Sequence, residues 1–252
     1  MSGRQILKVS KLDVRYGQIQ AVRDISLHVD EREIVCVVGP NGAGKSTTLL
    51  TVAGAITPAG GEIEAYDHSL IGMKPEDIAR LGISLVPEGR HIFGTLSVEE
   101  NLNLGTGLRR DKRKIREDLE RVFDRFSVLR DRLKQPAGRL SGGEQQQLAI
   151  ARALMTSPRL IMVDEPSLGL APQVIDQVYS ILLELRKERG MTLLIVEQST
   201  QRALSTADRL YILRSGVVAL SGHIEELTNG RLIEAAYFGF NEPDLSDGKG
   251  IV

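Results

Sequence analysis

Gly39-Pro-Asn-Gly-Ala-Gly-Lys45-Ser46 is the stretch that most restricts the fold of this chain. Its spacing, G-x-x-x-x-G-K-[ST], is typical of a loop whose backbone N–H groups point at phosphate oxygens while the lysine adds a positive charge. The motif predicts binding of a nucleoside triphosphate. The residues that we expect around the phosphates are Gly39, Pro40, Asn41, Gly42, Ala43, Gly44, Lys45, Ser46 and Thr47.

The residues on either side provide the context that this motif requires. The apolar run 34–38 is typical of a buried strand, and residues 45–53 continue the loop as a helix. A helix that starts directly after the loop presents further unpaired N–H donors to an anion. The single cysteine, Cys36, lies inside this strand, so we expect a core residue in a reduced compartment.

An acidic pair follows a second apolar strand, 160–163. Asp164 is placed to hold Mg²⁺, with the hydroxyl of Ser46 as a further ligand, and Glu165 is placed to polarise the water that attacks a γ-phosphate. Taken alone, Asp-Glu-Pro after a strand is equally well explained as a turn. The phosphate loop in the same chain favours the catalytic interpretation.

Ser141-Gly-Gly-Glu144 matches the S-x-x-E capping box and predicts the start of a helix that runs on to residue 154. Gly142 and Gly143 carry no side chain and leave the backbone open to the close approach of an anion. The simpler interpretation is a well-capped helix. The residues themselves leave both interpretations open.

The order of the elements predicts an α/β fold with a parallel sheet. Strands at 82–86, 160–163 and 192–196 and a helix at 173–189 alternate as in crossover units. Short β segments fill residues 6–38, and residues 209–220 form a closing hairpin. We therefore expect a P-loop NTPase core that carries an N-terminal antiparallel β subdomain.

A helical subdomain is expected to interrupt this core, because the chain from 97 to about 156 looks helical. One apolar stripe supports this, formed by Ile115, Leu119, Val122, Phe123, Phe126 and Leu129. The basic run 109–114 is interpreted as the solvated start of a helix in preference to a docking patch. The predicted single domain, 1–252, comprises a core of 1–95 and 159–230, an inserted helical subdomain of 96–158, and a C-terminal helix and tail of 231–252.

The composition is that of a packed globular protein, with 42% hydrophobic residues. Its 32 basic and 33 acidic residues nearly cancel, to a net charge of -1, so no overall field draws the chain to nucleic acid. The apolar runs are far shorter than the roughly 18 residues of a spanning helix, and the polar start lacks a secretory signal. We expect a cytoplasmic protein that meets membranes through a partner.

The phosphate loop together with Leu140-Ser-Gly-Gly-Glu144 resembles the ATP-binding cassette (ABC) ATPases, and the resemblance covers essentially the whole chain. At a finer level, four segments resemble the ATPase subunits of branched-chain amino acid importers. These segments are Val86-Pro-Glu-Gly-Arg-His-Ile-Phe93, Asp164-Glu-Pro-Ser-Leu-Gly-Leu-Ala-Pro172, Ile195-Val-Glu-Gln198 and Ala236-Tyr-Phe-Gly239.

In the family that this chain resembles, residues 140–144 correspond to the signature segment. The resemblance implies a head-to-tail dimer of cassettes in which the signature segment of each chain covers the ATP bound to the other chain. Ser141, Gly142, Gly143 and Glu144 would then act in trans, against the γ-phosphate of the partner's nucleotide. Tyr16 matches the position at which cassettes stack an aromatic ring on adenine, although a tyrosine before glycine is equally well a strand-end residue.

The chain departs from the general cassette pattern at three positions. Glu88 replaces a glutamine that contacts Mg²⁺, Gln198 replaces a histidine that reaches γ-phosphate, and Ala171 replaces an aspartate. An amide donates to phosphate but never becomes cationic, so Gln198 stabilises developing charge less than a protonated histidine. Glu88 adds negative charge that Mg²⁺ or a neighbour such as Arg90 can offset.

The resemblance therefore implies an ATP-hydrolysing subunit of an importer for branched-chain or related amino acids, with ATP and Mg²⁺ as cofactors. Lys45, Glu165 and Gln198 are the expected catalytic residues, and Ser46, Asp164 and Glu88 the expected metal site. The expected partners are a second ATPase subunit, membrane permease subunits and, indirectly, a substrate-binding protein, on the cytoplasmic face of the membrane. A urea or amide importer and a poorly hydrolysing regulatory cassette remain as alternatives.

Overall fold

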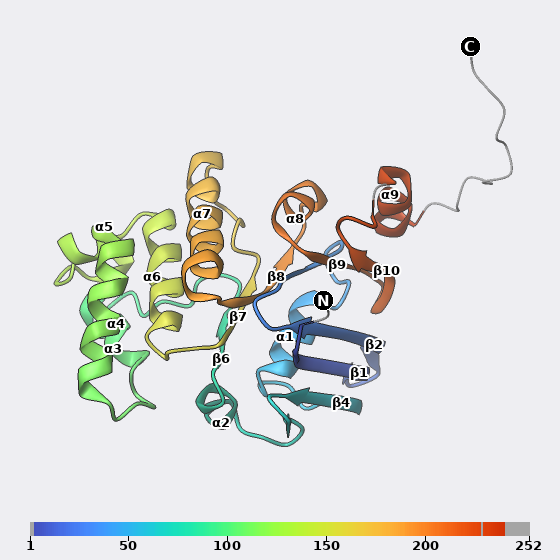
Figure 1. Cartoon of the computed structure of the whole chain (residues 1–252), viewed down its shortest axis with the longest axis horizontal. Coiled ribbons are helices and arrows are strands. Elements are labelled where there is room, and N and C mark those ends of the chain that lie inside the picture. The colour runs from blue at the N-terminus through green and yellow to red at the C-terminus, as the bar shows by residue number, and fades with distance from the viewer. Residues whose placement is uncertain (1–2, 228, 240–252) are drawn as a thin grey trace, which may run out of the picture.

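A computed structural model describes residues 3–227 and 229–239, which form two sheets and their covering helices (Figure 1). The larger sheet has six strands in the order β10-β9-β3-β8-β7-β6. Its strands are β3 (Ile34–Val38), β6 (Ile83–Val86), β7 (Leu160–Asp164), β8 (Thr192–Glu197), β9 (Arg209–Arg214) and β10 (Val217–His223).

The centre of this sheet is β3, which pairs in parallel with β8 on one side and β9 on the other. All five of its residues are buried, as expected for a strand that is covered on both faces. Cys36 pairs with Ile195 and Leu210 and is fully buried, so its prediction as a core residue is confirmed. Parallel pairing of β6, β7, β8, β3 and β9 brings the ends of these strands to one edge.

A second, antiparallel sheet lies beside the first. Its order is β2-β1-β4-β5, and each neighbouring pair is antiparallel. Its strands are β1 (Gln5–Tyr16), β2 (Ile19–Asp30), β4 (Gly60–Ala65) and β5 (His68–Ser69). The buried residues of β1 pack with Val35 and Val37 into the core on one face of the larger sheet; they are Ile6, Leu7, Val9, Leu12 and Val14.

Helices cover both faces of the larger sheet. Figure 1 shows α7 and α8 on one side and α1 with the small sheet on the other. Side chains of β3 alternate between these layers, because Ile34, Cys36 and Val38 belong to the core under α7 and the helical insert. The helices attached to the sheet are α1 (Lys45–Val52), α2 (Pro75–Arg80), α7 (Pro172–Arg189), α8 (Thr200–Thr206) and α9 (Gly230–Phe238).

The predicted insert is helical and lies at one end of the molecule (Figure 1). It contains α3 (Val98–Leu104), α4 (Lys112–Arg125), α5 (Ser127–Asp131), the 3-10 turn η1 (Ala137–Arg139) and α6 (Gly142–Leu154). The prediction of one helical stripe was wrong at its end. Helix α4 ends before Phe126, whose φ of -119° leaves the helical region, so Leu129 belongs to α5.

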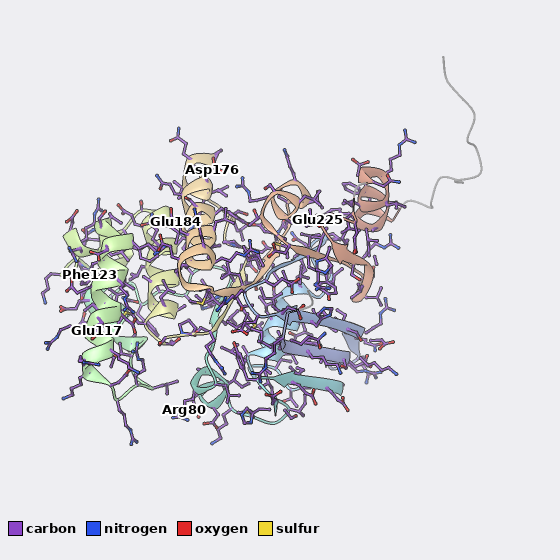
Figure 2. The ribbon with its side chains drawn as sticks, viewed as in Figure 1. Arg80, Glu117, Phe123, Asp176, Glu184 and Glu225 are labelled. Carbon is purple, nitrogen blue, oxygen red and sulfur yellow. The ribbon has the colours of Figure 1, made fainter. Side chains whose placement is uncertain are left out.

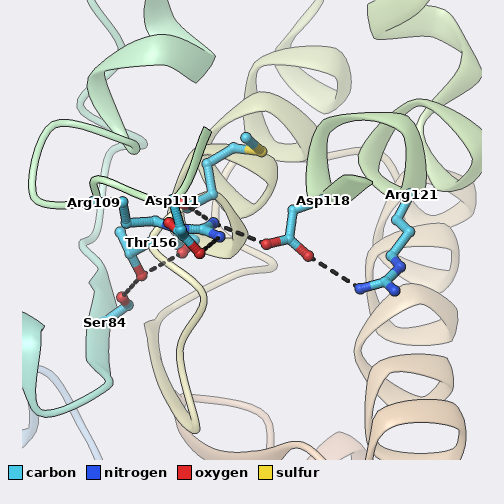
Figure 3. Close-up of polar contacts among 8 residues, drawn as sticks. Ser84, Arg109, Asp111, Asp118, Arg121 and Thr156 are labelled. Carbon is cyan, nitrogen blue, oxygen red and sulfur yellow. Dashed lines mark hydrogen bonds and ion pairs between the residues drawn. The ribbon is translucent and has the colours of Figure 1, made fainter. Parts of the chain in front are cut away.

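Polar contacts attach the insert to the sheet (Figure 3). The hydroxyl of Ser84 on β6 lies 2.6 Å from that of Thr156, just after α6. Arg109 donates to the carbonyl of Met155 at 2.9 Å and pairs with Asp118 of α4 at 2.8 Å. The side chain of Arg109 is therefore buried, against the expectation that the whole run 109–114 is a solvated helix start.

Helix α7 provides a second attachment. Arg125 at the end of α4 pairs with Glu184 of α7 at 3.2 Å and also with Glu188. Figure 2 labels Glu184 on α7 and Phe123 on α4. Phe123, two residues earlier on α4, is buried in the core that α6 and α7 share. The insert is thus held by packing as well as by charge.

The predicted fold class is confirmed: an α/β core with a parallel sheet, an antiparallel N-terminal sheet and an inserted helical segment. The exact division into 1–95 with 159–230, 96–158 and 231–252 stays a prediction. Residues 240–252 of its last segment lie outside the described part of the chain. No helix in the described ranges is both long and apolar enough to cross a membrane.

Candidate functional site

The loop between β3 and α1 depends on its glycines. Gly42 and Gly44 have φ values of 79° and 97°, in the left-handed region that side chains disfavour. A Cβ at Gly39 would lie 2.2 Å from the carbonyl oxygen of Leu213 on β9. The backbone is thus packed closely against the sheet while its N–H groups lie at the start of α1.

Lys45 folds back over this loop. Its ammonium donates to the carbonyl oxygens of Gly39 at 2.9 Å and Pro40 at 3.2 Å. It also lies 3.4 Å from Oε1 of Glu165, and both side chains are almost fully buried. A buried charge pair needs further hydrogen bonds to offset desolvation, and the two loop carbonyls provide them.

Glu165 follows β7 with a φ of 47°, a conformation that is uncommon for a residue with a side chain. Its backbone N–H donates to the carbonyl oxygen of Val196 at 2.9 Å, which ties this residue to the end of β8. The carboxylate accepts two hydrogen bonds from Nε2 of Gln198, at 3.1 and 2.9 Å.

Gln198 connects three segments that are distant in the sequence. Its amide nitrogen also donates to Oδ1 of Asn41 in the phosphate loop, at 2.8 Å. The preceding residue, Glu197, is buried and accepts the hydroxyl hydrogen of Tyr179 at 2.5 Å and the Gln198 backbone N–H at 3.1 Å. Gln198 is thus held between the ends of β7 and β8 and the loop.

Asp164 is buried at the end of β7, and its Oδ1 has no hydrogen-bond partner. Burial raises the pKa of Asp164 to about 6; a hydrogen bond with Ser46 and the charge of Lys45 oppose this, and the Glu165 and Glu88 carboxylates add to it. A cation would stabilise the ionised form. An unpartnered buried oxygen beside a serine hydroxyl fits Mg²⁺, which takes few protein ligands together with phosphate oxygens.

Lys45, Glu165 and Gln198 line one cavity of about 380 Å³, whereas Asp164 is not among its lining residues. Its lining residues are Ala21, Asn41, Gly42, Gly44, Lys45, Ser46, Thr47, Glu88, Glu165, Leu168 and Gln198. Most of the predicted phosphate, metal and catalytic residues are therefore gathered in one place. Tyr16 does not line the cavity, but its half-exposed ring ends 3.5 Å from the Thr47 hydroxyl.

The start of α6 has the geometry predicted for it. Ser141 is the N-cap, and the reciprocal hydrogen bonds between Ser141 and Glu144 form a capping box. Glu144 also pairs with Arg132 at 3.1 Å. A Cβ at Gly143 would lie 2.3 Å from Val174 of α7, so that glycine allows close helix packing. None of the signature residues 141–144 lines the cavity.

Two features near the site were missed or misplaced by sequence reasoning. The buried Glu197–Tyr179 pair has no local signal except a carboxylate at the end of an apolar strand. Arg90 was named, beside Mg²⁺, as a group that can offset Glu88; its guanidinium donates to Oε1 of Gln145 on α6, at 3.2 Å. The sequence held no cue for this contact, because the two residues are far apart along the chain.

The sequence pattern that defines the ABC transporter family matches residues 22–168. Among its relatives, the chain is 44% identical to the high-affinity branched-chain amino acid transport ATP-binding protein BraG of Pseudomonas aeruginosa, over 93% of this chain and 100% of BraG. It is 35% identical to the probable branched-chain amino acid transport ATP-binding protein LivF of Archaeoglobus fulgidus, over 93% of this chain and 99% of that protein.

Solved structures agree with this relationship. A nucleotide-free ATP-binding cassette from an ABC transporter superimposes with a TM-score of 0.80 at 25% identity, covering 91% of this chain and 98% of the cassette. A cassette in its ADP conformation gives a TM-score of 0.78 at 27% identity, covering 94% and 99%. The phosphate loop, the acidic pair and the capped helix start all lie within residues 22–168, which match the family pattern. The chain therefore belongs to the ABC transporter family as an ATP-binding cassette.

Proposed function

We propose that this chain is the ATP-hydrolysing subunit that powers an importer of branched-chain or related amino acids. The observation that carries the proposal is the network in which Lys45, Glu165 and Gln198 meet over the phosphate loop. Similarity to BraG and LivF over almost the whole of each protein supports the same class of cargo.

The loop and Lys45 bind the phosphates in this proposal. Backbone N–H groups at the start of α1 and the Lys45 ammonium neutralise negative charge in the ground state. Ser46 and Asp164, with Glu88 at the rim of the cavity, would hold Mg²⁺, which supplies charge neutralisation across the phosphates. Ionised Asp164 is the form that this role requires.

Glu165 orients and polarises the attacking water, since its carboxylate lies beside Lys45 in the same cavity. Gln198 positions Glu165 through both carboxylate oxygens and provides an amide donor near the phosphate loop. Because an amide stays neutral, Gln198 adds hydrogen bonding without adding charge. Tyr16, beside Thr47, would stack on the base.

The signature residues act on a second nucleotide in this proposal. Ser141, Gly142, Gly143 and Glu144 stand at the start of α6 and do not line the cavity of their own chain. A helix start rich in glycine favours an anion. The partner is therefore a second cassette, either a copy of this chain or a related one, arranged head to tail.

A groove beside the signature helix suits the permease. It has a volume of about 490 Å³ and is lined by residues of α2, β6, the end of α3 and α6. Phe93 and Leu104 contribute exposed apolar surface to it, at 54% and 50% exposure. We infer that a membrane permease subunit docks here, that a substrate-binding protein acts through the permease, and that the chain sits on the cytoplasmic face of the membrane.

A urea or amide importer is the nearest alternative, and a regulatory cassette that binds ATP without useful turnover is the other. The hydrogen bonds from Gln198 to Glu165 favour turnover, because they position the group that would polarise water. Nothing in the near-neutral charge of the chain favours nucleic acid as a partner.

Copurification with the permease subunits, followed by reconstitution in vesicles, tests the proposal. ATP turnover is measured with the binding protein and with leucine, isoleucine, valine, urea or acetamide in turn. We expect stimulation by the branched-chain amino acids. Stimulation by urea or acetamide alone would show that the transported solute is an amide and not a branched-chain amino acid. Absence of ATP turnover in every case would favour the regulatory cassette.

A further inference from the structure

The segment after β6 connects three parts of the molecule. Glu88 lines the nucleotide cavity, Arg90 contacts α6, and His91 and Phe93 line the apolar groove. Only four residues, 89–92, therefore lie between the cavity residue Glu88 and the groove residue Phe93. One short segment therefore contacts the groove, the cavity and α6.

The backbone of this segment has an unusual conformation. Gly89, Arg90 and His91 all have positive φ values, of 75°, 69° and 44°. The N–H of His91 donates to the carbonyl oxygen of Gly89 at 2.8 Å, which closes a three-residue turn centred on Arg90. Two consecutive left-handed residues with side chains cost free energy, so contacts with the surroundings must hold them in place.

Helix α6 provides those contacts from both of its ends. The guanidinium of Arg90 covers Gly142, where an added Cβ would lie 3.2 Å from it, and donates to Gln145. The Gln145 amide in turn donates to the carbonyl oxygen of Leu140 at 3.1 Å. Arg152, from the last turn of α6, donates to the carbonyl oxygen of Arg90 at 3.4 Å.

Within the described part of the chain, Arg90 is held there by hydrogen bonds and not by an ion pair. Across residues 3–227 and 229–239 its guanidinium forms no ion pair with a carboxylate. It also lies at the positive end of the α6 dipole, where a cation is disfavoured. The contact with α6 therefore rests on hydrogen-bond geometry and on the turn at Arg90, and both change when the segment moves.

We propose that Arg90 is a positioning residue that sets the first turn of α6, and thus the signature residues, according to the state of the groove. This rests on the proposed function of the groove and signature. When the permease shifts Phe93, the turn at Arg90 relaxes and the guanidinium releases or regains Gln145. The signature end of α6 moves relative to the partner's nucleotide as a result.

The first test measures hydrogen exchange in the isolated subunit. Arg90→Ala should speed exchange of the Glu144 and Gln145 backbone N–H groups by about tenfold, since both are bonded to Ser141. Exchange of the Thr48 N–H, bonded to Gly44 in α1, should not change. Arg130→Ala, in α5, is the matched control because its ion pairs join only Glu120 and Asp124.

The second test uses the complex with the permease. Arg90→Ala should reduce the ratio of complexed to free ATP turnover towards one, while the Kd for MgATP changes less than twofold. Gln145→Ala should cause the same loss of stimulation. The double variant should lose no more, because each substitution removes the same hydrogen bond between Arg90 and Gln145. A merely structural defect would instead lower the melting temperature and add across the two substitutions.

The outcomes separate this inference from the proposed function. If ATP turnover by the wild-type complex is no faster than turnover by the free subunit, the proposal that the permease docks in the groove is wrong. Unchanged exchange at residues 144–145 in Arg90→Ala, or additive losses in the double variant, would overturn the role of Arg90 alone. If Arg90→Ala does not fold, Gln145→Ala carries both measurements.

Discussion

Two helix starts in this chain present N–H groups in different surroundings. Helix α1 begins at Gly44 with no side-chain cap, and its first residue, Lys45, is buried in a charged cavity. Helix α6 begins at Ser141 with a complete capping box, and its first residues do not line that cavity. The first start is part of a site within the chain, whereas the second acts on a partner's nucleotide only in the function proposed above.

The largest expected effect concerns the first helix start. Glu165→Gln removes the carboxylate that would polarise water, so turnover should fall by roughly 10²–10⁴-fold. The Kd for MgATP should stay within a few-fold, because Lys45 and the loop remain. Single-turnover hydrolysis measures the rate, and calorimetry measures the Kd for MgATP. Lys45→Ala is the matched comparison and should instead weaken binding; equal losses of affinity in both variants would contradict the assigned roles.

The next prediction tests the second helix start. Gly142→Asp places a carboxylate near the partner's γ-phosphate, and repulsion of about 4 kcal/mol should weaken ATP-driven dimerisation by about 10³-fold. Binding of MgATP by the monomer should persist. Sizing chromatography in a Glu165→Gln background gives the readout.

Gly142→Asn is the control for size, and we expect it to dimerise better than Gly142→Asp. Because the Arg90 guanidinium lies 3.2 Å from the position of the new Cβ, it should partly neutralise the aspartate. Adding Arg90→Ala to Gly142→Asp should then weaken dimerisation further. A dimer that forms as readily with Gly142→Asp as without it would show that the two helix starts do not share a nucleotide.

A third prediction uses the pKa of Asp164, about 6 in the folded chain against about 3.9 when unfolded. Between these values the folded state binds more protons, so stability without metal should fall as the pH rises from 4 to 6. The full difference corresponds to about 3 kcal/mol. Urea denaturation of wild type and Asp164→Asn at several pH values measures it, and the variant should lack this dependence.

Mg²⁺ should reverse the direction of this effect, since it requires the ionised carboxylate. Binding of MgATP below pH 6 should release protons from wild type and fewer from Asp164→Asn, which calorimetry in two buffers detects. Equal proton release by the two proteins would place the metal elsewhere in the cavity.

A fourth prediction concerns Gln198, whose amide side chain is neutral. Gln198→Ala removes the donor that positions Glu165 and reaches Asn41, so turnover should fall by about 10²-fold. Gln198→His should keep or raise the basal rate. Glu197→Gln is a useful control, because it keeps an acceptor for Tyr179 and leaves the Gln198 side chain in place. If Gln198→Ala hydrolyses ATP as fast as wild type, Gln198 has no role in hydrolysis.

The smallest expected effect is at the rim. Tyr16→Ala should weaken ATP binding by about 1–2 kcal/mol if the ring stacks on adenine, with little change in turnover at saturation. Tyr16→Phe separates the ring from the hydroxyl that lies near Thr47. It should bind ATP as wild type does; a loss as large as that of Tyr16→Ala would assign the effect to the hydroxyl.

Much of the fold could be read from local patterns. The strand before the loop, the helix after it and the capping box at Ser141 follow from spacing that acts within a few residues. The end of α4 could not be predicted in this way. Phe126 continues the apolar spacing, yet its side chain packs into the core while the backbone turns into α5.

The sequence by itself determined the class of site: a glycine loop, an acidic pair after a strand and a capped helix, each defined by neighbouring residues. The tertiary structure alone decided which side chains meet. Gln198 contacts Asn41 across 157 positions, and Arg90 contacts Gln145 across 55. Such contacts depend on the register of the parallel strands and on how the helical insert packs, and no local spacing encodes either.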